Sequence, residues 1–103
     1  MTEYKIKITQ RAFSDIYECV LFVSNVSKQA AKDLHQEIMS SLDSLKSFPN
    51  AYPNIEGLTI GGVSVKRMPV HHGRYFVVYK IESNLITVYD VIDSRKDNSI
   101  LKL

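Results

Sequence analysis

The chain has 103 residues, of which 45% are hydrophobic and 23% charged, and its net charge is +2. This length suits a single domain over residues 1–103, and the ordinary composition excludes disordered and fibrous proteins. One cysteine, no apolar run near the roughly 18–20 residues of a membrane span, and an N-terminus without a signal peptide predict a cytoplasmic protein that does not associate with membranes.

The chain is predicted to begin with a strand and a helix. Residues 4–9 alternate between apolar and polar side chains, which is the pattern of a half-buried strand. Thr9 is placed to cap a helix that runs to about Asn25, because its hydroxyl can accept a hydrogen bond from a first-turn N–H. The apolar residues that are spaced to share one face of this helix are Phe13, Ile16, Tyr17, Val20 and Val23.

A second, longer helix is expected to begin after Ser27, which is again a capping residue. Its predicted buried stripe consists of Ala31, Leu34, Ile38, Leu42 and Leu45. Pro49 ends the helix, because proline has no amide hydrogen and disfavours a helical residue before it. Since the link between the two helices is short, they are expected to form an antiparallel hairpin.

The C-terminal half is predicted to be rich in strands. Residues 49–62 contain two prolines and the pair Gly61-Gly62, and we interpret them as a loop. Strands are expected over residues 63–68, 75–81 and 85–93, with a tight turn between the last two. The order β-α-α-β-β-β predicts an α+β fold, in which an N-terminal helical hairpin packs on one face of an antiparallel sheet. The other face is left for solvent or a partner.

No common catalytic motif is present, since the sequence lacks a glycine-rich phosphate loop and the H-E-x-x-H, C-x-x-C and G-x-S-x-G patterns. Cys19 is interpreted as a packing residue of the first helix. The pair His71-His72 precedes Gly73 in a turn and lacks a third metal ligand, so no metal is expected there. No other cofactor is expected either, since no cofactor-binding motif is present. His72 therefore either belongs to a plain turn or acts as a general acid or base.

Basic residues gather in the second half of the chain. Residues 58–103 carry seven basic and four acidic side chains, whereas residues 1–57 carry six basic and seven acidic ones. The cations expected near one end of the sheet are Lys66, Arg67, Arg74, Arg95 and Lys96. Such a group can hold a phosphodiester backbone, dock an acidic partner, or simply face solvent.

Three tyrosines fall on the predicted strands, at positions 75, 79 and 89. Tyr79 and Tyr89 alternate with apolar residues, which favours packing in the core. A tyrosine on the open face would instead be able to stack on a nucleic-acid base. The spacing leaves both interpretations open.

The order of these segments resembles the RelE/ParE superfamily of toxins from bacterial type II toxin–antitoxin systems. The resemblance rests on residues 4–9, the Leu42-x-x-Leu45-x-x-Phe48-Pro49 end of the long helix, residues 77–81, and residues 85–93 running into Ser94-Arg95-Lys96-Asp97. The closing segment is more similar to the ParE type than to the RelE type. The resemblance implies a compact toxin that a cognate antitoxin neutralises, covering apolar helix and sheet-edge surface while its acidic groups meet the basic residues.

In RelE-type members the resemblance implies cleavage of ribosome-bound mRNA by basic residues. Lys66-Arg67 approximately matches the basic pair of the second strand, and Arg95 matches the arginine after the last strand. Phe76 stands where the family has a strand arginine, so that Arg74 is the nearest substitute. Leu101 occupies the place of the C-terminal tyrosine found in many nucleases of this type.

Three functions follow from the resemblance. The first is a ParE-like toxin, acting in plasmid stabilisation by binding DNA gyrase without catalysis. The second is a metal-independent endoribonuclease, an mRNA interferase, in which Arg95, Arg74 and His72 are catalytic and Lys66 and Arg67 hold the phosphate. The third is a nontoxic member that only binds its antitoxin. We favour the first, because Phe76 and Leu101 replace groups that the nuclease needs, and Lys96 is then a contact to the target.

Overall fold

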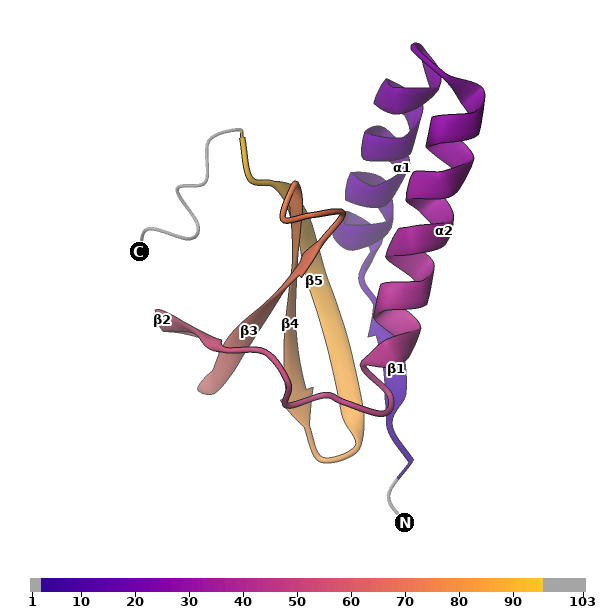
Figure 1. The fold of residues 1–103 in the computed structure, drawn as a ribbon. Helices are drawn as coiled ribbons and strands as arrows, with labels where there is room; N and C mark the ends of the chain where they lie inside the picture. Colours follow the sequence, from indigo (N-terminus) through magenta and orange to yellow (C-terminus); the bar gives the residue numbers. More distant parts are fainter. Residues whose placement is uncertain (1–2, 96–103) are drawn as a thin grey trace.

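The structure is a computed structural model that describes residues 3–95. Its elements are β1 (Lys5–Ile8), α1 (Gln10–Ser24), α2 (Lys28–Ser44), β2 (Asn54–Ile60), β3 (Val63–Val70), β4 (Tyr75–Glu82) and β5 (Leu85–Asp93). The strands form one sheet in the order β1-β5-β4-β3-β2, and the two helices lie side by side against it (Figure 1). The predicted α+β class, with an N-terminal helical hairpin on a sheet, is confirmed.

Both predicted helix starts are confirmed by their caps. The Thr9 hydroxyl accepts a hydrogen bond from the Ala12 N–H, and the Ser27 hydroxyl accepts one from the Ala30 N–H, each at 3.1 Å. The Thr9 hydroxyl also donates to the backbone carbonyl of Tyr89, at 3.2 Å. The first cap therefore joins α1 to β5 as well as starting the helix.

Two details of the predicted sheet are wrong. Residues 54–60 are not part of a loop but form β2, which pairs with β3 in an antiparallel but irregular register. Gly57 has a φ of 78°, and this break hides the strand from a pattern search. The sheet is mixed rather than antiparallel, because β1 pairs with β5 in parallel. Alternation identifies a strand, but the direction of its neighbour depends on contacts distant in sequence.

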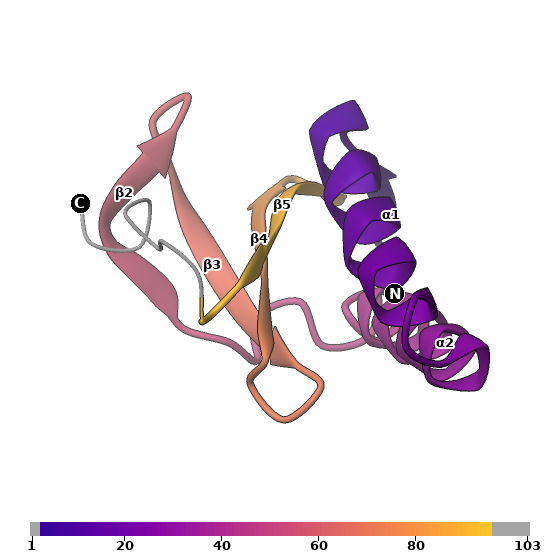
Figure 2. The same cartoon turned by 90° about the horizontal axis from the view of Figure 1, so that it is seen from above.

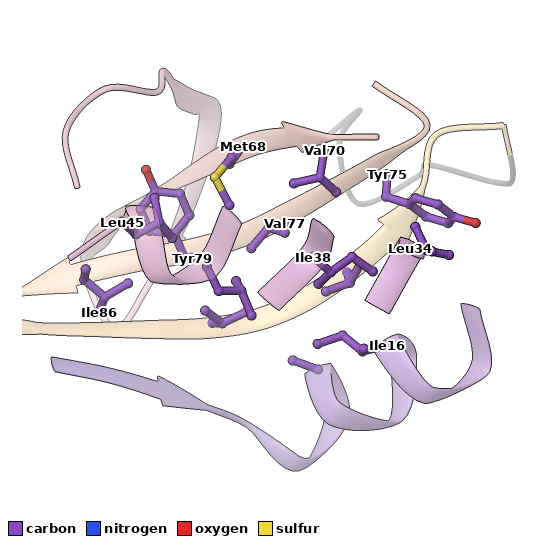
Figure 3. Close-up of a cluster of buried hydrophobic side chains, with 14 residues drawn as sticks. Ile16, Leu34, Ile38, Leu45, Met68, Val70, Tyr75, Val77, Tyr79 and Ile86 are labelled. Atoms are coloured by element: carbon purple, nitrogen blue, oxygen red, sulfur yellow. The ribbon is translucent and has the colours of Figure 1, made fainter. Parts of the chain in front are cut away.

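The core lies between the helical hairpin and the sheet (Figure 3). The predicted stripe of α2 is confirmed, since Ala31, Leu34, Ile38, Leu42 and Leu45 are all buried. Apart from Ala31, these side chains share one cluster with Met68, Val77, Tyr79 and Ile86 from three strands. The Tyr79 hydroxyl, fully buried, donates a hydrogen bond to the Pro49 carbonyl at 2.9 Å. The core packing predicted for this tyrosine is thereby confirmed.

The predicted buried face of α1 is partly wrong. Ile16 is buried, but the side chains of Phe13 and Tyr17 are 51% and 66% exposed. The helix packs against α2 and against β5, and these neighbours cover only the side that carries Ala12 and Ile16. Spacing along a helix identifies an apolar face but not how far its neighbours reach across it.

The face of the sheet away from the helices carries a smaller apolar cluster. Ile55, Val65 and Val78 are buried there, with Leu58, Ile60 and Ile92 packed around them. Seen from above, β2 is the strand farthest from the helices, beyond β3, β4 and β5 (Figure 2). We call the face of the sheet that carries this smaller cluster, opposite the helices, the open face. Within residues 3–95, neither helix combines the length and apolarity needed to cross a membrane.

Candidate functional site

The turn between β3 and β4 has an unusual backbone. His71, His72 and Gly73 have φ angles of 54°, 58° and 80°, three successive residues in the left-handed region. A non-glycine residue in this conformation costs roughly 1–2 kcal/mol, so that two adjacent histidines here require support from the surrounding structure. The Ser94 hydroxyl provides some of it, because its one hydrogen is shared between the Gly73 and Arg74 carbonyls, at 2.8 and 2.9 Å.

The same contacts bring Arg74 and Arg95 to one end of the sheet. The backbone N–H of Ser94, next to Arg95, donates to the Arg74 carbonyl at 2.8 Å. Arg74 lies in the turn rather than in β4, which begins at Tyr75. The predicted convergence of cations at one sheet end therefore applies to this pair of arginines.

Arg95 is held by an acidic neighbour. Its Nε and Nη2 atoms lie 3.2 and 3.1 Å from the two carboxylate oxygens of Asp93. The Arg95 backbone N–H also donates to this carboxylate, at 2.9 Å. These hydrogen bonds raise the pKa of Arg95 and compensate part of its charge. An incoming phosphate would have to compete with Asp93 for the guanidinium.

The two histidines of the turn differ in their contacts. His71 Nδ1 lies 3.1 Å from a carboxylate oxygen of Glu37 in α2, and its ring lies 6.3 Å from that of Tyr75. His72 is exposed. The ring centroids of the two histidines are 5.7 Å apart. His71 thus fastens the turn to α2, and His72 is the one that solvent can reach freely.

The predicted basic pair of β3 is divided between the two faces of the sheet. Lys66 Nζ donates to the Tyr52 carbonyl at 3.2 Å, on the side of the helices. The Arg67 guanidinium lies 4.8 Å from the centre of the Phe76 ring, on the open face. Adjacent residues of a strand point to opposite faces, so these two cations cannot bind one phosphate together. Lys96, the last predicted cation, lies outside the described residues.

Sequence reasoning missed a polar cluster on the open face. Lys80 Nζ is 2.6 Å from the Glu82 carboxylate and 5.7 Å from the centre of the Tyr89 ring. The lysine side chain is only 10% exposed, and its hydrogen bond with Glu82 raises the pKa of Lys80. Alternation along β4 from Phe76 could have placed Lys80 on this face.

An apolar stripe is exposed on α1, and it includes two residues, Phe13 and Tyr17, that our prediction had assigned to the core. It consists of Phe13, Tyr17 and Leu21, which are 51%, 66% and 49% exposed. Residues four apart lie next to each other on a helix, so the three side chains form one continuous surface. We call it the α1 stripe. Exposed apolar surface of this kind is typical of contacts with another protein.

Cys19 packs, half-buried, against the main core, as expected of a packing residue. In residues 3–95 no three histidine, cysteine, aspartate or glutamate side chains are grouped so that they could hold a metal ion.

Comparison with known proteins gives a consistent result. The family described as "ParE toxin of type II toxin-antitoxin system, parDE" matches residues 6–98 of the chain. A search of curated protein sequences found no significant match.

Two solved structures share the fold. One is a chromosomal ParDE toxin–antitoxin system from P. aeruginosa, with a TM-score of 0.71 and 14% identity, covering 90% of this chain and 98% of that one. The other is an archaeal RelE-RelB complex from Pyrococcus horikoshii OT3, with a TM-score of 0.57 and 17% identity, covering 94% and 100%. At these identities the likeness concerns the fold alone.

Proposed function

The chain belongs to the ParE toxin family of type II toxin–antitoxin systems, and on that premise we propose that it arrests growth by binding DNA gyrase. It acts in the cytoplasm, and a cognate antitoxin neutralises it until the antitoxin is lost. Such a pair stabilises a plasmid that carries it, because cells that lose the plasmid are left with free toxin.

One observation carries the choice of a binding toxin over a nuclease, namely the separation of Lys66 and Arg67 on opposite faces of the sheet. Cleavage of a phosphodiester without a metal needs several cations that converge on the same developing charge. In this chain one member of the pair holds the Tyr52 carbonyl and the other stacks on Phe76. This arrangement supports a surface that binds.

Arg67 and Phe76 form the part of the open face best suited to contact a protein target. A guanidinium over an aromatic ring offers a flat surface with charge and apolar area together, and arginine and aromatic residues are enriched in binding hot spots. Arg74 and Arg95 extend the positive charge toward the end of the sheet. The proposed gyrase contact therefore runs from Arg67 to Arg95, with Lys96 as its continuation in sequence.

The α1 stripe, on the helical hairpin, is the proposed contact of the antitoxin. Phe13 and Tyr17 are exposed in the free chain, and covering them would remove apolar surface from water. The stripe lies on a helix, whereas Arg67 lies on the sheet and Arg74 and Arg95 lie at its end, so the antitoxin and the target need not compete for one surface.

A second candidate, the mRNA interferase, is kept because the backbone hydrogen bond from Ser94 to Arg74 brings the segments of Arg74 and Arg95 to the sheet end whose turn carries exposed His72. In that reaction the ribose 2′-hydroxyl attacks the adjacent phosphate, the 5′-oxygen of the next nucleotide leaves, and a cyclic phosphate remains. His72 would move the proton, and the two arginines would stabilise the charge on the phosphate.

The deciding experiment is a short induction of the chain in growing bacteria, with DNA synthesis and protein synthesis measured in the same culture. Gyrase binding predicts that DNA synthesis stops first and that the purified chain inhibits supercoiling by gyrase. An early stop of translation with cut mRNA would favour the interferase. Unchanged growth would leave only a nontoxic member that binds an antitoxin.

Two variants separate the toxic mechanisms further. Arg95→Ala and His72→Ala should each abolish mRNA cleavage if the chain is an interferase, because both groups would then touch the reacting phosphate. Toxicity that survives both substitutions would rule out the enzyme. For gyrase binding, Arg67→Ala should weaken inhibition at least tenfold, with Lys66→Ala as the matched control from the other face.

A further inference from the structure

The turn between β3 and β4 is attached to two different parts of the fold. On the side of the helices, the Nδ1 atom of His71 lies 3.1 Å from Oε1 of Glu37, in the middle of α2. On the side of the sheet, the backbone N–H of Ser94, just after β5, donates to the carbonyl of Arg74 at 2.8 Å. The turn therefore lies between the helical hairpin and the end of β5.

His71 connects these two attachments through its own backbone. Its carbonyl accepts a hydrogen bond from the N–H of Arg74 at 3.1 Å, while its ring contacts Glu37. Arg74 is exposed, and it is one of the two arginines at the end of the sheet. A displacement of the His71 ring from α2 is therefore passed to Arg74 through a single hydrogen bond.

The turn does not hold its shape by local preference. His71 and His72 have φ angles of 54° and 58°, and this left-handed region is disfavoured for residues with a Cβ. The residues on either side of the turn, Val70 and Tyr75, share the main core with Leu34 of α2 (Figure 3). The ends of the turn are thus fixed by packing, and the strained residues between them depend on hydrogen bonds.

The charge of His71 decides how strong its contact with Glu37 is. A neutral imidazole donates from one nitrogen and accepts at the other, so only the tautomer with a hydrogen on Nδ1 can donate to the carboxylate. A protonated ring donates from both nitrogens and adds the attraction between opposite charges. Because histidine changes its charge between about pH 5 and 8, the contact is strongest at the acidic end of this range.

Two other titratable rings lie near His71. The centroid of its ring is 5.7 Å from that of His72 and 6.3 Å from that of Tyr75. Burial raises the pKa of Tyr75 above its ordinary value of 10.0, so Tyr75 stays neutral between about pH 5 and 8. His72 gains a positive charge over the same range, which opposes that of His71. The charged and titratable groups around the turn are Glu37 of α2, His72 and Arg74 of the turn itself, Tyr75 of β4, Cys19 of α1, and Asp93 of β5 with the following Arg95.

We propose that Glu37 is a positioning residue for the sheet end that carries Arg74 and Arg95, and that it acts through His71 most strongly when this histidine is protonated. Glu37 holds the turn in the conformation from which Arg74 is presented. The inference rests on the proposed function for its consequence, which is tighter target binding at acidic pH. The geometry of the turn is tested without the target.

Hydrogen exchange measured by NMR, and corrected for the intrinsic effect of pH, reports how often the turn opens. The amides of Arg74 and Ser94 donate to the two carbonyls of the turn, and the amide of Ala30, in the cap of α2, is an internal reference. In Glu37→Ala, protection of the Arg74 and Ser94 amides should fall about two- to fivefold at about pH 6, as expected for a partly exposed ion pair. The loss should be smaller at about pH 8, and Ala30 should be unchanged at both values.

Conservative variants separate the charge from the hydrogen bond. Glu37→Gln keeps an acceptor oxygen without a charge, so it should protect the turn like the unaltered chain at about pH 8 but show no gain at about pH 6. His72→Asn should keep the gain and His71→Asn should lose it, since asparagine tolerates the left-handed backbone at both positions. Asp43→Asn is the matched control, because it removes the same charge from an ion pair with Lys46 at 3.2 Å and should leave both amides unchanged.

The consequence for target binding is measured with the purified chain and gyrase. Inhibition of supercoiling by Glu37→Ala should be about two- to fivefold weaker than that by the unaltered chain at about pH 6. Asp43→Asn should again behave like the unaltered chain.

The inference is overturned if Glu37→Ala and the unaltered chain protect Arg74 and Ser94 equally, or if the loss of protection does not change with pH. A loss that extends to Ala30 also overturns it, since this would mean that the whole domain is less stable. If the unaltered chain does not inhibit gyrase, the proposed function fails while the result on the turn stands. Equal inhibition by Glu37→Ala, in spite of a turn that opens more often, overturns the positioning role alone.

Discussion

The carboxylate of Asp15 in α1 accepts a hydrogen bond from the backbone N–H of Val91 in β5, with 3.1 Å between Oδ2 and N. The register between β4 and β5 shifts by one residue at this point, so that Tyr89 is a β-bulge. A bulge interrupts the ladder, and a backbone donor beside it needs another acceptor. Arg11 adds an ion pair to Asp90, with 2.7 Å between Nε and Oδ1. The first turns of α1 thus hold the irregular part of β5.

Asp15 is expected to make stability depend on pH. Burial raises the pKa of Asp15 above its ordinary value of 3.8, and nearby Asp90 raises it further, against the lowering effect of the Val91 N–H. The folded state therefore binds the proton more tightly than the unfolded state, and the free energy of unfolding falls as the pH rises from 3.8 through the raised pKa. Asp15→Asn removes this titration, and urea unfolding should then show a flatter pH profile.

The matched variant Asp15→Ala separates the charge from the hydrogen bond. Alanine leaves the Val91 N–H without its acceptor, which should cost about 1–3 kcal/mol of unfolding free energy, whereas asparagine keeps an acceptor oxygen. The two variants are compared by urea unfolding at neutral pH. Equal losses in both would show that the Val91 hydrogen bond contributes nothing.

Tyr79 gives the second prediction. Burial raises the pKa of Tyr79 to about 12, with a further contribution from Tyr52. Because its hydroxyl is the hydrogen-bond partner of the Pro49 carbonyl, Tyr79→Phe should lower the unfolding free energy by roughly 1–2 kcal/mol without changing the fold. Chemical denaturation measures the loss, and Tyr17→Phe, at an exposed position, is the control.

The ionisation of Tyr79 can be followed directly. The unfolded chain loses the tyrosine proton near the ordinary value of 10.0, before the folded chain does, so stability should fall as the pH rises from there toward about 12. When tyrosine ionisation is followed by absorbance as the pH is raised, the step at the highest pH should disappear in Tyr79→Phe. If that step remained, the late titration would belong to another tyrosine.

Local chemistry explains what the sequence predicts correctly in this fold. The caps at Thr9 and Ser27 and the stripe around Ile38 depend on residues only a few positions apart, and all three are observed. The strand β2 was missed because Gly57 interrupts its alternation. The parallel pairing of β1 with β5 joins segments about 80 residues apart, and no local pattern reports it.

The candidate site was harder to predict, for a similar reason. The sequence places Lys66 next to Arg67, but a strand turns neighbours to opposite faces, so proximity in sequence means separation in space. Arg74 and Arg95 lie at one sheet end because the turn before β4 is hydrogen-bonded to Ser94. The contacts of Arg95 with Asp93 and of Arg67 with Phe76 are seen only in the structure.

The hairpin turn between β4 and β5 offers a stabilising substitution. Ser83 has a φ of 53°, a left-handed conformation that a serine adopts at a cost. Glycine has no Cβ and favours such a position in a two-residue hairpin, so Ser83→Gly should raise the unfolding free energy by roughly 0.5–1 kcal/mol. Thermal unfolding measures the gain, and Ser83→Ala, which keeps a Cβ, should bring none.

The α1 stripe gives the last prediction, because its exposure is the feature that a partner would change. Phe13→Ser/Tyr17→Ser replaces side chains that are 51% and 66% exposed, so each substitution should alter the unfolding free energy of the free chain by no more than about 0.5 kcal/mol. If the antitoxin covers the stripe, the same double variant should bind the cognate antitoxin at least tenfold more weakly in a titration.

Phe22→Ser is the control for this experiment, because Phe22 is 67% exposed on a different side of α1. It should leave the antitoxin affinity unchanged while removing a similar apolar area. Growth arrest adds an independent measurement, since the double variant should remain toxic and escape neutralisation when both genes are expressed. Full neutralisation of Phe13→Ser/Tyr17→Ser would place the antitoxin elsewhere, because burial of two exposed aromatic rings is too large a contribution to be lost without effect.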